Sequence, residues 1–415
     1  MSRTVLVLNC GSSSIKYQLV DVASGGVPAM GLAERIGEPK GQLWHRGPRG
    51  ELTRADPIDD HEAGLRAVLA AFEKTGPRLA DANVAVVGHR VVHGGERFAE
   101  PALIDNDVLD AIEELSTLAP LHNPANLSGI KVARAALPDL PHVAVFDTAF
   151  HQTLPPHAFT YAVPDMWRTA HGVRRYGFHG TSVEYVSRRA AEMIGRSTDE
   201  CNLVVLHLGN GASATAVAGG RSVDTSMGLT PVEGLVMGTR SGDVDPAVVT
   251  HLIRVAYLSA EDVDDQLNRE SGLLGLAGAN DMREVHRRAD SGDQAALLAL
   301  EVYCYRIRKY VGAYYAALGR VDGIVFTAGV GENDPDVRAW ALSGLERLGI
   351  EVDPVLNTSP QRDAHTISPD GADIAVMVIP TNEELEIARQ ALIAATRPTR
   401  AASPHPTQGE TASSP

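Results

Sequence analysis

The chain has 415 residues, which suggests two domains of ordinary size. It carries 37 Lys and Arg residues against 52 Asp and Glu residues, a formal net charge of -15, and this acidic balance argues against a nucleic-acid-binding surface. The 3 cysteines, Cys10, Cys201 and Cys304, are too widely spaced for a disulfide framework or a zinc site and are typical of a reducing compartment. Because the sequence shows neither a signal peptide nor the ~20 apolar residues of a membrane span, we expect a cytoplasmic protein that binds no membrane.

Apolar runs that predict buried strands alternate with segments whose apolar residues recur at helical spacing. In chain order the predictions are a strand at 5–9, short strands and turns at 25–57, a helix at 62–74, a strand at 84–93, helices at 105–118 and 126–136, a strand at 142–147, a helix at 182–194, strands at 203–209 and 214–220, a helix at 293–318, a strand at 323–329, a helix at 335–348, a strand at 375–380 and a helix at 383–395. Thr181 and Asp334 are placed to cap two of these helices. The alternation predicts an α/β fold.

The C-terminal stretch from Arg397 is rich in Pro, Ser, Thr and Ala and has no hydrophobic period. Such a composition cannot build a packed core, so we expect residues 397–415 to form a disordered tail.

A strand followed by a Gly/Ser/Asn turn occurs three times, in "VLVLNCGSSS", "LVVLHLGNGAS" and "IVFTAGVGEN". The first two continue into a further apolar run, as a duplicated hairpin would. Two such hairpins facing across a cleft could hold a phosphate chain from both sides.

The first turn combines Gly11, which lets a ligand approach the backbone, with three serines and Lys16. It lacks the spacing of a Walker loop, and a polar hairpin turn with a solvated Lys16 remains an equal alternative.

The second turn, 209–211, lacks the helix and the acidic residue of a dinucleotide fingerprint, so we favour a phosphate-contacting turn over a tight hairpin. The third turn, with Gly329 and Gly331 before a helix, suits an anion or a ribose, or is an ordinary strand-to-helix turn.

Charged and aromatic side chains cluster beside glycines in the middle of the chain. Each of them alone is more often structural than catalytic. Together they suit a transferring phosphoryl group, because buried arginines pair with carboxylate or phosphate. The residues are Arg90, His93, His122, Asn123, Asp147, Arg174, Arg175, Phe178, His179 and Arg240.

Nine stretches carry a family resemblance, in family order from Val5 to Arg389: "NCGSSSIKYQL", "GHRVVHGGERF", "HNPANL", "VFDTAFHQTLP", "RRYGFHGTS", "HLGNGASATAV", "SVDTSMGLTPVEGLVMGTRSGDVDP", "FTAGVGEN" and "IPTNEELEIAR". The chain resembles the acetate and propionate kinases of the actin/Hsp70/sugar-kinase superfamily. The resemblance implies two actin-like (ribonuclease H-like) domains with duplicated mixed sheets flanked by helices, and an active site in the cleft between them. The first domain would span 1–149 and be joined by the helix 383–396; the second would span 150–382 and carry the nucleotide-binding and dimerisation surfaces.

The resemblance also implies roles for individual residues. Asn9 and Glu383 would position Mg²⁺ (or Mn²⁺), and Ser12, Ser14 and Lys16 would line the phosphate path. Arg90 and Arg240 would bind the carboxylate and the moving phosphoryl group, His179 would steady its equatorial oxygens with His122 nearby, and Asp147 would act as a base or as an orienting group. Val92, Leu121, Phe178 and Pro231 would form the pocket for the alkyl end of the acid. ATP or ADP would be held by His207, Leu208, Gly209, Asn210 and Gly211, by Asp281, Met282 and Arg283, and by Gly329, Val330, Gly331, Glu332 and Asn333.

The implied activity is reversible, Mg-dependent, in-line phosphoryl transfer from ATP to acetate, giving acetyl phosphate and ADP, in a homodimer. Since one methylene shifts binding by only ~1–3 kcal/mol, propionate or another short-chain acid remains an alternative substrate. A non-kinase ATPase of the same superfamily and a non-catalytic nucleotide sensor are further alternatives. Val183 and Ala214 depart from the residues that family members often carry, and neither holds an implied catalytic role.

Overall fold

The computed structural model describes residues 3–397. Apart from Arg397, the predicted tail 397–415 lies outside the described residues. No helix of the described part is long and apolar enough to cross a membrane.

The first half is built on an 8-stranded sheet with the order β5-β4-β3-β2-β1-β6-β8-β7. Its strands are β1 (Thr4–Cys10), β2 (Ser14–Asp21), β3 (Ala29–Glu34), β4 (Gln42–Gly47), β5 (Gly50–Arg54), β6 (Val84–Val91), β7 (Ala102–Leu103) and β8 (His142–Phe146). The helices that accompany it are α1 (His61–Thr75), α2 (Asn106–Glu114), α3 (Asn123–Ala136) and α15 (Glu383–Thr396).

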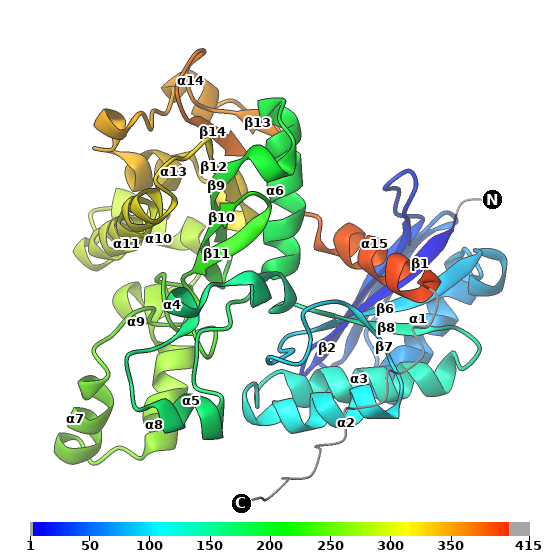
Figure 1. The fold of residues 1–415 in the computed structure, drawn as a ribbon. Helices are drawn as coiled ribbons and strands as arrows, with labels where there is room; N and C mark the ends of the chain where they lie inside the picture. The colour runs from blue at the N-terminus through cyan, green and yellow to red at the C-terminus, as the bar shows by residue number, and fades with distance from the viewer. Residues whose placement is uncertain (1–2, 398–415) are drawn as a thin grey trace, which may run out of the picture.

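Side chains alternate between the two faces of this sheet, as the period of a strand requires. Leu6 and Leu8 of β1 pack with α1 and α3. Val5 and Val7 pack on the other face, against the apolar side of α15. The C-terminal helix therefore returns to cover the N-terminal sheet (Figure 1).

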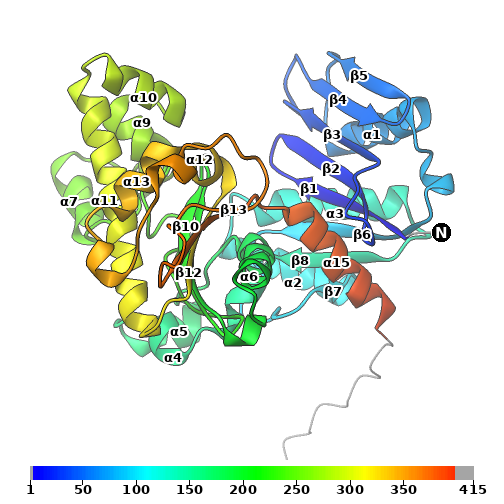
Figure 2. The same ribbon diagram turned by 90° about the horizontal axis from the view of Figure 1, so that it is seen from above.

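The second half is built on a 6-stranded sheet with the order β11-β10-β9-β12-β14-β13. Its strands are β9 (Asn202–Leu208), β10 (Ala212–Ala218), β11 (Arg221–Thr225), β12 (Gly323–Thr327), β13 (His365–Thr366) and β14 (Ala375–Val378). One face packs against α6 (Gly180–Ile194), and the other against the long helix α11 (Gln294–Leu318). Seen from above, α6 lies beside α15, so these two helices join the halves (Figure 2).

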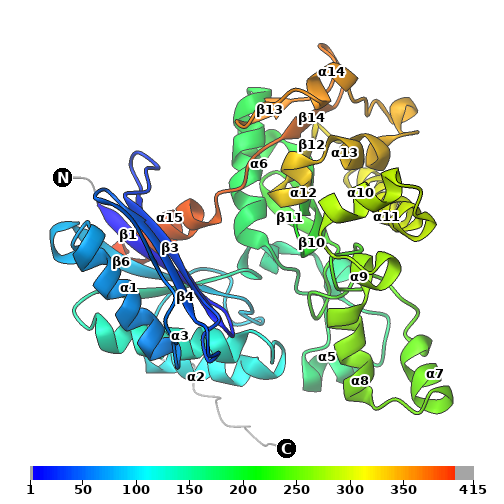
Figure 3. The ribbon, with the colours of Figure 1, turned by 180° about the vertical axis from the view of Figure 1, so that it is seen from behind.

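Further helices are α4 (Pro156–Phe159), α5 (Asp165–His171), α7 (Ala247–Val255), α8 (Ala260–Asp265), α9 (Gly272–Ala277), α10 (Met282–Asp290), α12 (Ala328–Asn333), α13 (Pro335–Leu342) and α14 (Pro354–Asn357). Short turns of 3₁₀-helix lie at Leu79–Asp81, Leu115–Thr117, Ala149–Thr153, Thr198–Glu200 and Glu346–Leu348, and Gln266–Glu270 forms a π-helical turn. Helices α7 and α8 project from the second half, away from the first sheet (Figure 3).

The two sheets repeat one topology. In β3-β2-β1-β6-β8 and in β11-β10-β9-β12-β14, the first three strands are antiparallel neighbours and the next two run parallel to the third. The predicted α/β class with duplicated mixed sheets is therefore confirmed. The domain boundaries at 149/150 and 382/383 remain a prediction, which the packing of α15 on the first sheet supports.

Four local predictions need correction. Helix α6 begins at Gly180 with His179 as its N-cap, so Thr181 does not cap it. Helix α3 begins at Asn123, three residues early. The predicted strand 323–329 ends at Thr327, where the helical turn α12 begins. The predicted helix 335–348 ends at Leu342, because Gly344 takes a left-handed backbone with φ 84°.

Candidate active site

Three parallel strands of the first sheet, β1, β6 and β8, end at one edge and present polar side chains there. Asn9 lies near the end of β1, Arg90 near the end of β6, and Asp147 directly after β8. Because the carboxyl ends of parallel strands meet at one sheet edge, the pairing of β1, β6 and β8 brings these three residues together.

Arg90 and Asp147 form a forked ion pair at this edge. Arg90 Nε donates to Asp147 Oδ1 at 3.0 Å, and Arg90 Nη2 donates to Oδ2 at 2.5 Å. The Asp147 side chain is only 2% exposed, and burial raises its pKa while the Arg90 guanidinium opposes that rise. Arg90 Nη1 also reaches Asn9 Oδ1 at 3.4 Å. With both carboxylate oxygens occupied, Asp147 is placed to orient Arg90.

His122 precedes α3, whose first turn is tied to the strand ends. The Asn123 side chain accepts from the backbone amide of His93 and donates to its carbonyl. Asn126 accepts from the Val92 amide at 3.0 Å. Burial, and then the charges of Arg240 and Arg90, lower the pKa of His122 to about 4. His122 is therefore a neutral imidazole near two guanidinium groups at pH 7.

His179 comes from the second half and occupies a left-handed backbone conformation with φ 59°, which is uncommon for a residue with a side chain. The next residue, Gly180, donates its amide to the Asp147 carbonyl at 2.9 Å, and a Cβ there would lie 2.5 Å from that oxygen. His179 Nδ1 bonds Ser213 Oγ at 3.0 Å, and its ring stacks on His207 with centroids 4.1 Å apart. Burial and then the neighbouring His207 keep the pKa of His179 well below its ordinary value, so the ring is neutral.

Arg240 is a half-buried cation that makes no ion pair within residues 3–397. Its Nη1 donates to the Pro231 carbonyl at 3.1 Å, and its pKa is lowered by burial and by the charge of Arg90. A Cβ on Gly211 would lie 3.4 Å from Arg240 Nη1 and 3.5 Å from His179 Nε2. A guanidinium and a neutral imidazole thus converge on one point beside a glycine, as an anion site requires.

The glycine turn at 209–211 borders a pocket of about 300 Å³. Its lining residues come from the turn between β9 and β10, from the loop at Gly238 and from α9 to α12 with the residues just before α10, and are Gly209, Asn210, Gly238, Leu273, Asn280, Asp281, Met282, Tyr303 and Val330. Five predicted nucleotide residues therefore share one pocket. Sequence reasoning missed three lining residues, Gly238, Asn280 and Tyr303. Asn280 and Tyr303 carried no motif, and the need for a glycine at 238 is seen only in the structure, where a Cβ would lie 2.0 Å from Asn210 Oδ1.

The turn Gly329–Asn333, which belongs to α12, is fixed by hydrogen bonds to Arg338 and to Thr381. Buried Arg338 donates to the carbonyls of Gly331 and Glu332 at 3.0 and 3.1 Å. Glu332 Oε1 in turn accepts from the Thr381 amide at 3.1 Å, just before α15.

Other predicted residues lie as follows. Arg283 pairs with Asp281 at 2.5 Å, but its side chain is 91% exposed. Lys16 forms an ion pair with Glu384, and its side chain is 50% exposed, so its place on the phosphate path remains a prediction. The hydroxyls of Ser12 and Ser14 make no hydrogen bond within the described residues and are open to a ligand.

The predicted alkyl pocket is partly assembled. Val92 and Phe178 belong to one buried cluster, and Pro231 is bonded through its carbonyl to Arg240. Leu121 is 42% exposed, so its place in this pocket remains a prediction.

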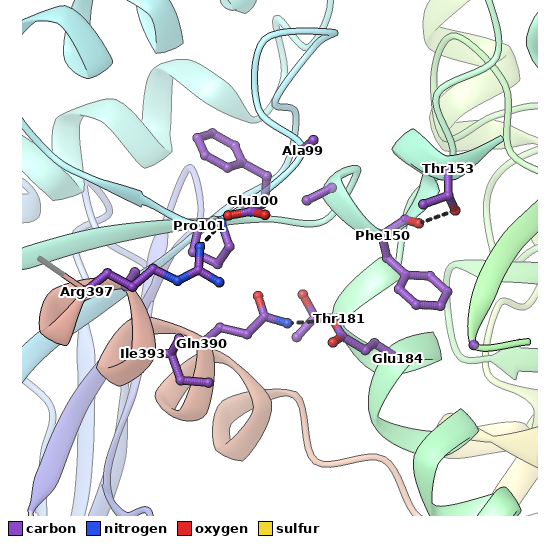
Figure 4. A pocket seen from close by; sticks show the side chains of 14 residues that line it. Ala99, Glu100, Pro101, Phe150, Thr153, Thr181, Glu184, Gln390, Ile393 and Arg397 are labelled. Atoms are coloured by element: carbon purple, nitrogen blue, oxygen red, sulfur yellow. Dashed lines mark hydrogen bonds and ion pairs between the residues drawn. The ribbon is translucent and has the colours of Figure 1, made fainter. Parts of the chain in front are cut away.

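A second pocket, of about 350 Å³, lies between α6 and α15 and contains none of the predicted site residues (Figure 4). Its polar side chains are paired with one another: Gln390 Nε2 donates to Glu184 Oε2 at 2.7 Å, and Arg397 pairs with Glu100. Glu184, which lines this pocket, forms a charge cluster with Arg188 and the buried Glu386, with one cation for two carboxylates.

The duplicated strand order of the two mixed sheets is that of the actin-like class of α/β proteins. The chain belongs to the acetokinase family, whose family model matches residues 4–389. The acetate kinase of Leifsonia xyli subsp. xyli is 58% identical over 388 residues, covering 94% of this chain and 98% of that protein. The acetate kinase of Streptomyces coelicolor is 58% identical over 391 residues, covering 94% and 96%.

Two solved structures are similar over nearly the whole chain. The crystal structure of Porphyromonas gingivalis acetate kinase superposes with a TM-score of 0.90 at 43% identity, covering 95% of this chain and 100% of that one. A propionate kinase from Francisella tularensis subsp. tularensis superposes with a TM-score of 0.89 at 40% identity, covering 94% and 99%. The predicted family is confirmed.

Proposed function

We propose that this protein is an acetate kinase, which transfers the γ-phosphoryl group of ATP to acetate and runs the reaction in both directions. The observation that carries the proposal is the convergence of Arg240 and His179 beside Gly211, facing an Arg90 that Asp147 holds in place. The relatives at 58% identity are acetate kinases.

The chemistry needs little covalent work from the protein. A carboxylate oxygen of acetate attacks the γ-phosphorus as the bond to the β-phosphate oxygen breaks, and ADP leaves. The acetate carboxylate is already a nucleophile, so no base is needed, and Asp147 serves to aim Arg90. Arg90 and Arg240 bring acceptor and phosphoryl group together, and His179 steadies the equatorial oxygens.

Neutral imidazoles suit this site. His122 and His179 are both kept uncharged by burial and by nearby cations, so each offers a hydrogen bond without adding charge repulsion to Arg90 and Arg240. The site can thus be polar at several points while its positive charge comes from two guanidinium groups.

The alkyl end of the acid would rest against Val92, Phe178 and Pro231, with Leu121 closing the pocket. The nucleotide would lie with its phosphates along the turns 9–16 and 209–211 and its adenosine in the 300 Å³ pocket beside α10. The hydroxyls of Ser12 and Ser14, which are open in the structure, would bond phosphate oxygens.

A divalent cation fits the residues at the strand edge. Asn9 and Glu383 supply one amide and one carboxylate, and Glu383 makes no hydrogen bond or ion pair to protein within residues 3–397, while burial raises its pKa. Mg²⁺ or Mn²⁺ with substrate phosphates and water commonly uses one or two carboxylates. When bound, the ion would neutralise charge on the β- and γ-phosphates.

We further propose a cytoplasmic homodimer. Buried, free Cys10, Cys201 and Cys304 suit a reducing compartment. Helix α7 and the residues after it expose apolar side chains, among them Val255 at 63% and Tyr257 at 90%, which a second copy could cover. Light scattering on the purified chain would measure the mass of the assembly.

The function is tested by incubating the protein with ATP, Mg²⁺, hydroxylamine and a short-chain acid, and by measuring the hydroxamate and ADP formed. We expect acetohydroxamate and ADP in equal amounts, with acetate turned over faster than propionate or butyrate. ADP released equally well without any acid would instead identify an ATPase. Nucleotide binding with neither product would identify a sensor.

A further inference from the structure

Two segments that border the nucleotide pocket are joined by an ion pair. His286 lies on α10, just beyond Asp281 and Met282, and Asp334 directly follows α12, which carries Val330. His286 Nε2 lies 2.8 Å from Asp334 Oδ2, and the two side chains are 20% and 13% exposed. Within the described part of the chain, this is the only side-chain hydrogen bond between α10 and residues 328–342.

Asp334 is held rigidly for this contact. Its Oδ1 accepts from the Val337 amide at 3.0 Å and caps the N-terminus of α13, which leaves Oδ2 for His286. The carboxylate therefore belongs to the α12–α13 junction, whereas the imidazole belongs to α10. Any change in the spacing of the two segments must lengthen or break the bond.

The surroundings of His286 raise its pKa and so favour the charged imidazolium. The hydrogen bond to Asp334 is the main cause that raises its pKa, and Asp336 and Asp290 add to it against the effect of burial. Other groups packed nearby do not reverse this. Burial keeps the Cys304 thiol of α11 protonated by raising its pKa to about 12, it likewise raises the pKa of Tyr303, and Arg338 of α13 lies against the carbonyls of α12.

We propose that the His286–Asp334 ion pair is a positioning clamp that fixes the width of the adenosine pocket and thereby sets the affinity for the adenine nucleotide. The inference rests on the proposed function, because it assigns this pocket to ATP and ADP. Neither residue lines the pocket, so both affect nucleotide binding through the segments that carry the lining residues Met282 and Val330.

The test compares His286→Gln with the wild-type protein in steady-state kinetics. We expect the KM for ATP to rise about three- to tenfold, as for the loss of one ordinary intramolecular hydrogen bond, with kcat and the KM for acetate changed less than twofold. Across pH 6 to 9, the KM for ATP of the wild type should rise as His286 loses its proton, and that of His286→Gln should not show this step. His286→Lys, which keeps a cation to higher pH, should retain the low KM at pH 9.

The matched control is Arg287→Gln on the same helix, which removes an exposed ion pair with Glu284 that does not cross to α12. Asp334→Asn keeps an N-cap for α13 and should resemble His286→Gln. A KM for ATP in His286→Gln equal to that of Arg287→Gln would overturn the clamp, and so would a lowered melting temperature with unchanged nucleotide affinity.

Calorimetric titration with ADP alone separates this inference from the proposed function. If the wild type fails to form acetyl phosphate, the proposed function is wrong, yet weaker ADP binding by His286→Gln would still support the clamp. If turnover is normal and ADP binds both proteins equally, only the clamp is wrong.

Discussion

Replacing Arg240 by alanine removes a cation that the proposed function places in catalysis and that has no ion-pair partner within the described residues. Its guanidinium faces Arg90, and the structure gives it a carbonyl of Pro231 as its hydrogen-bond acceptor. Two unit charges about 4 Å apart at an effective dielectric constant of about 20 interact by about 4 kcal/mol, which corresponds to about 10³ in rate. Arginines that face a transferring phosphoryl group have been worth about 10³–10⁵.

We therefore expect Arg240→Ala to lose at least about 10³-fold in kcat while its KM for ATP changes little. The nucleotide pocket is lined by other residues, so ADP should still bind. The melting temperature should not fall, because burial and the Arg90 charge already disfavour the Arg240 cation.

The assay measures kcat and KM by coupled ADP release, ADP affinity by calorimetry, and the melting temperature. Arg320→Ala, an exposed ion-pair arginine of the same half, controls for the loss of a surface cation. Asp147→Asn supplies the contrast, since it leaves Arg90 buried without its anion and should lose both activity and stability. An Arg240→Ala protein with unchanged kcat would refute the assignment, and one that melts earlier would refute the electrostatic reasoning.

Three further predictions follow from the geometry. Gly211→Ala places a methyl group 3.4 Å from Arg240 Nη1 and 3.5 Å from His179 Nε2, so we expect a folded protein with kcat reduced at least tenfold, as measured by turnover beside an unchanged melting curve. Glu383→Gln should raise the Mg²⁺ concentration needed for half-maximal rate, which a metal titration measures, whereas an unchanged requirement would exclude Glu383 from the metal site. Burial and then the nearby Glu386 raise the pKa of Glu184 to about 7. Ionisation of Glu184 therefore destabilises the folded protein above pH 7, whereas below about pH 4.5 the group is protonated in both the folded and the unfolded state and this cost is absent. In urea unfolding we expect Glu184→Gln to be more stable than the wild type at pH 8 by about 1 kcal/mol, after solvent screening, and to show no such gain near pH 4.5.

Strand ends were the part of the site that physical reasoning could place. Asn9 and Asp147 end predicted strands, and parallel strands bring such ends to one edge, whereas Arg90 stood inside the predicted strand 84–93, which in the structure ends at Val91. That Asp147 holds Arg90 in a fork depends on side-chain rotamers, which no spacing in the sequence encodes. Residue type and neighbouring glycines grouped His179 and Arg240 with Arg90 and Asp147, and the resemblance gave each of them its role.

Helices α7 to α10 were missed because their local signals are weak. In α10 only Met282 and Val285 are buried, and most of the helix is charged, so the apolar stripe is too narrow to detect. Lys16 could be assigned to solvent or phosphate from its loop, but its observed partner Glu384 lies more than 360 residues away and depends on where α15 packs. Long-range packing of this kind decides contacts that local patterns leave open.

In the proposed reaction the phosphoryl group passes directly from ATP to the acid between Arg90, Arg240 and His179. The stereochemical course at phosphorus, followed with ATP made chiral at the γ-position by oxygen isotopes, tests it most directly. The account predicts inversion of configuration in the acetyl phosphate formed. Retention would require a phosphorylated group on the protein and would contradict it.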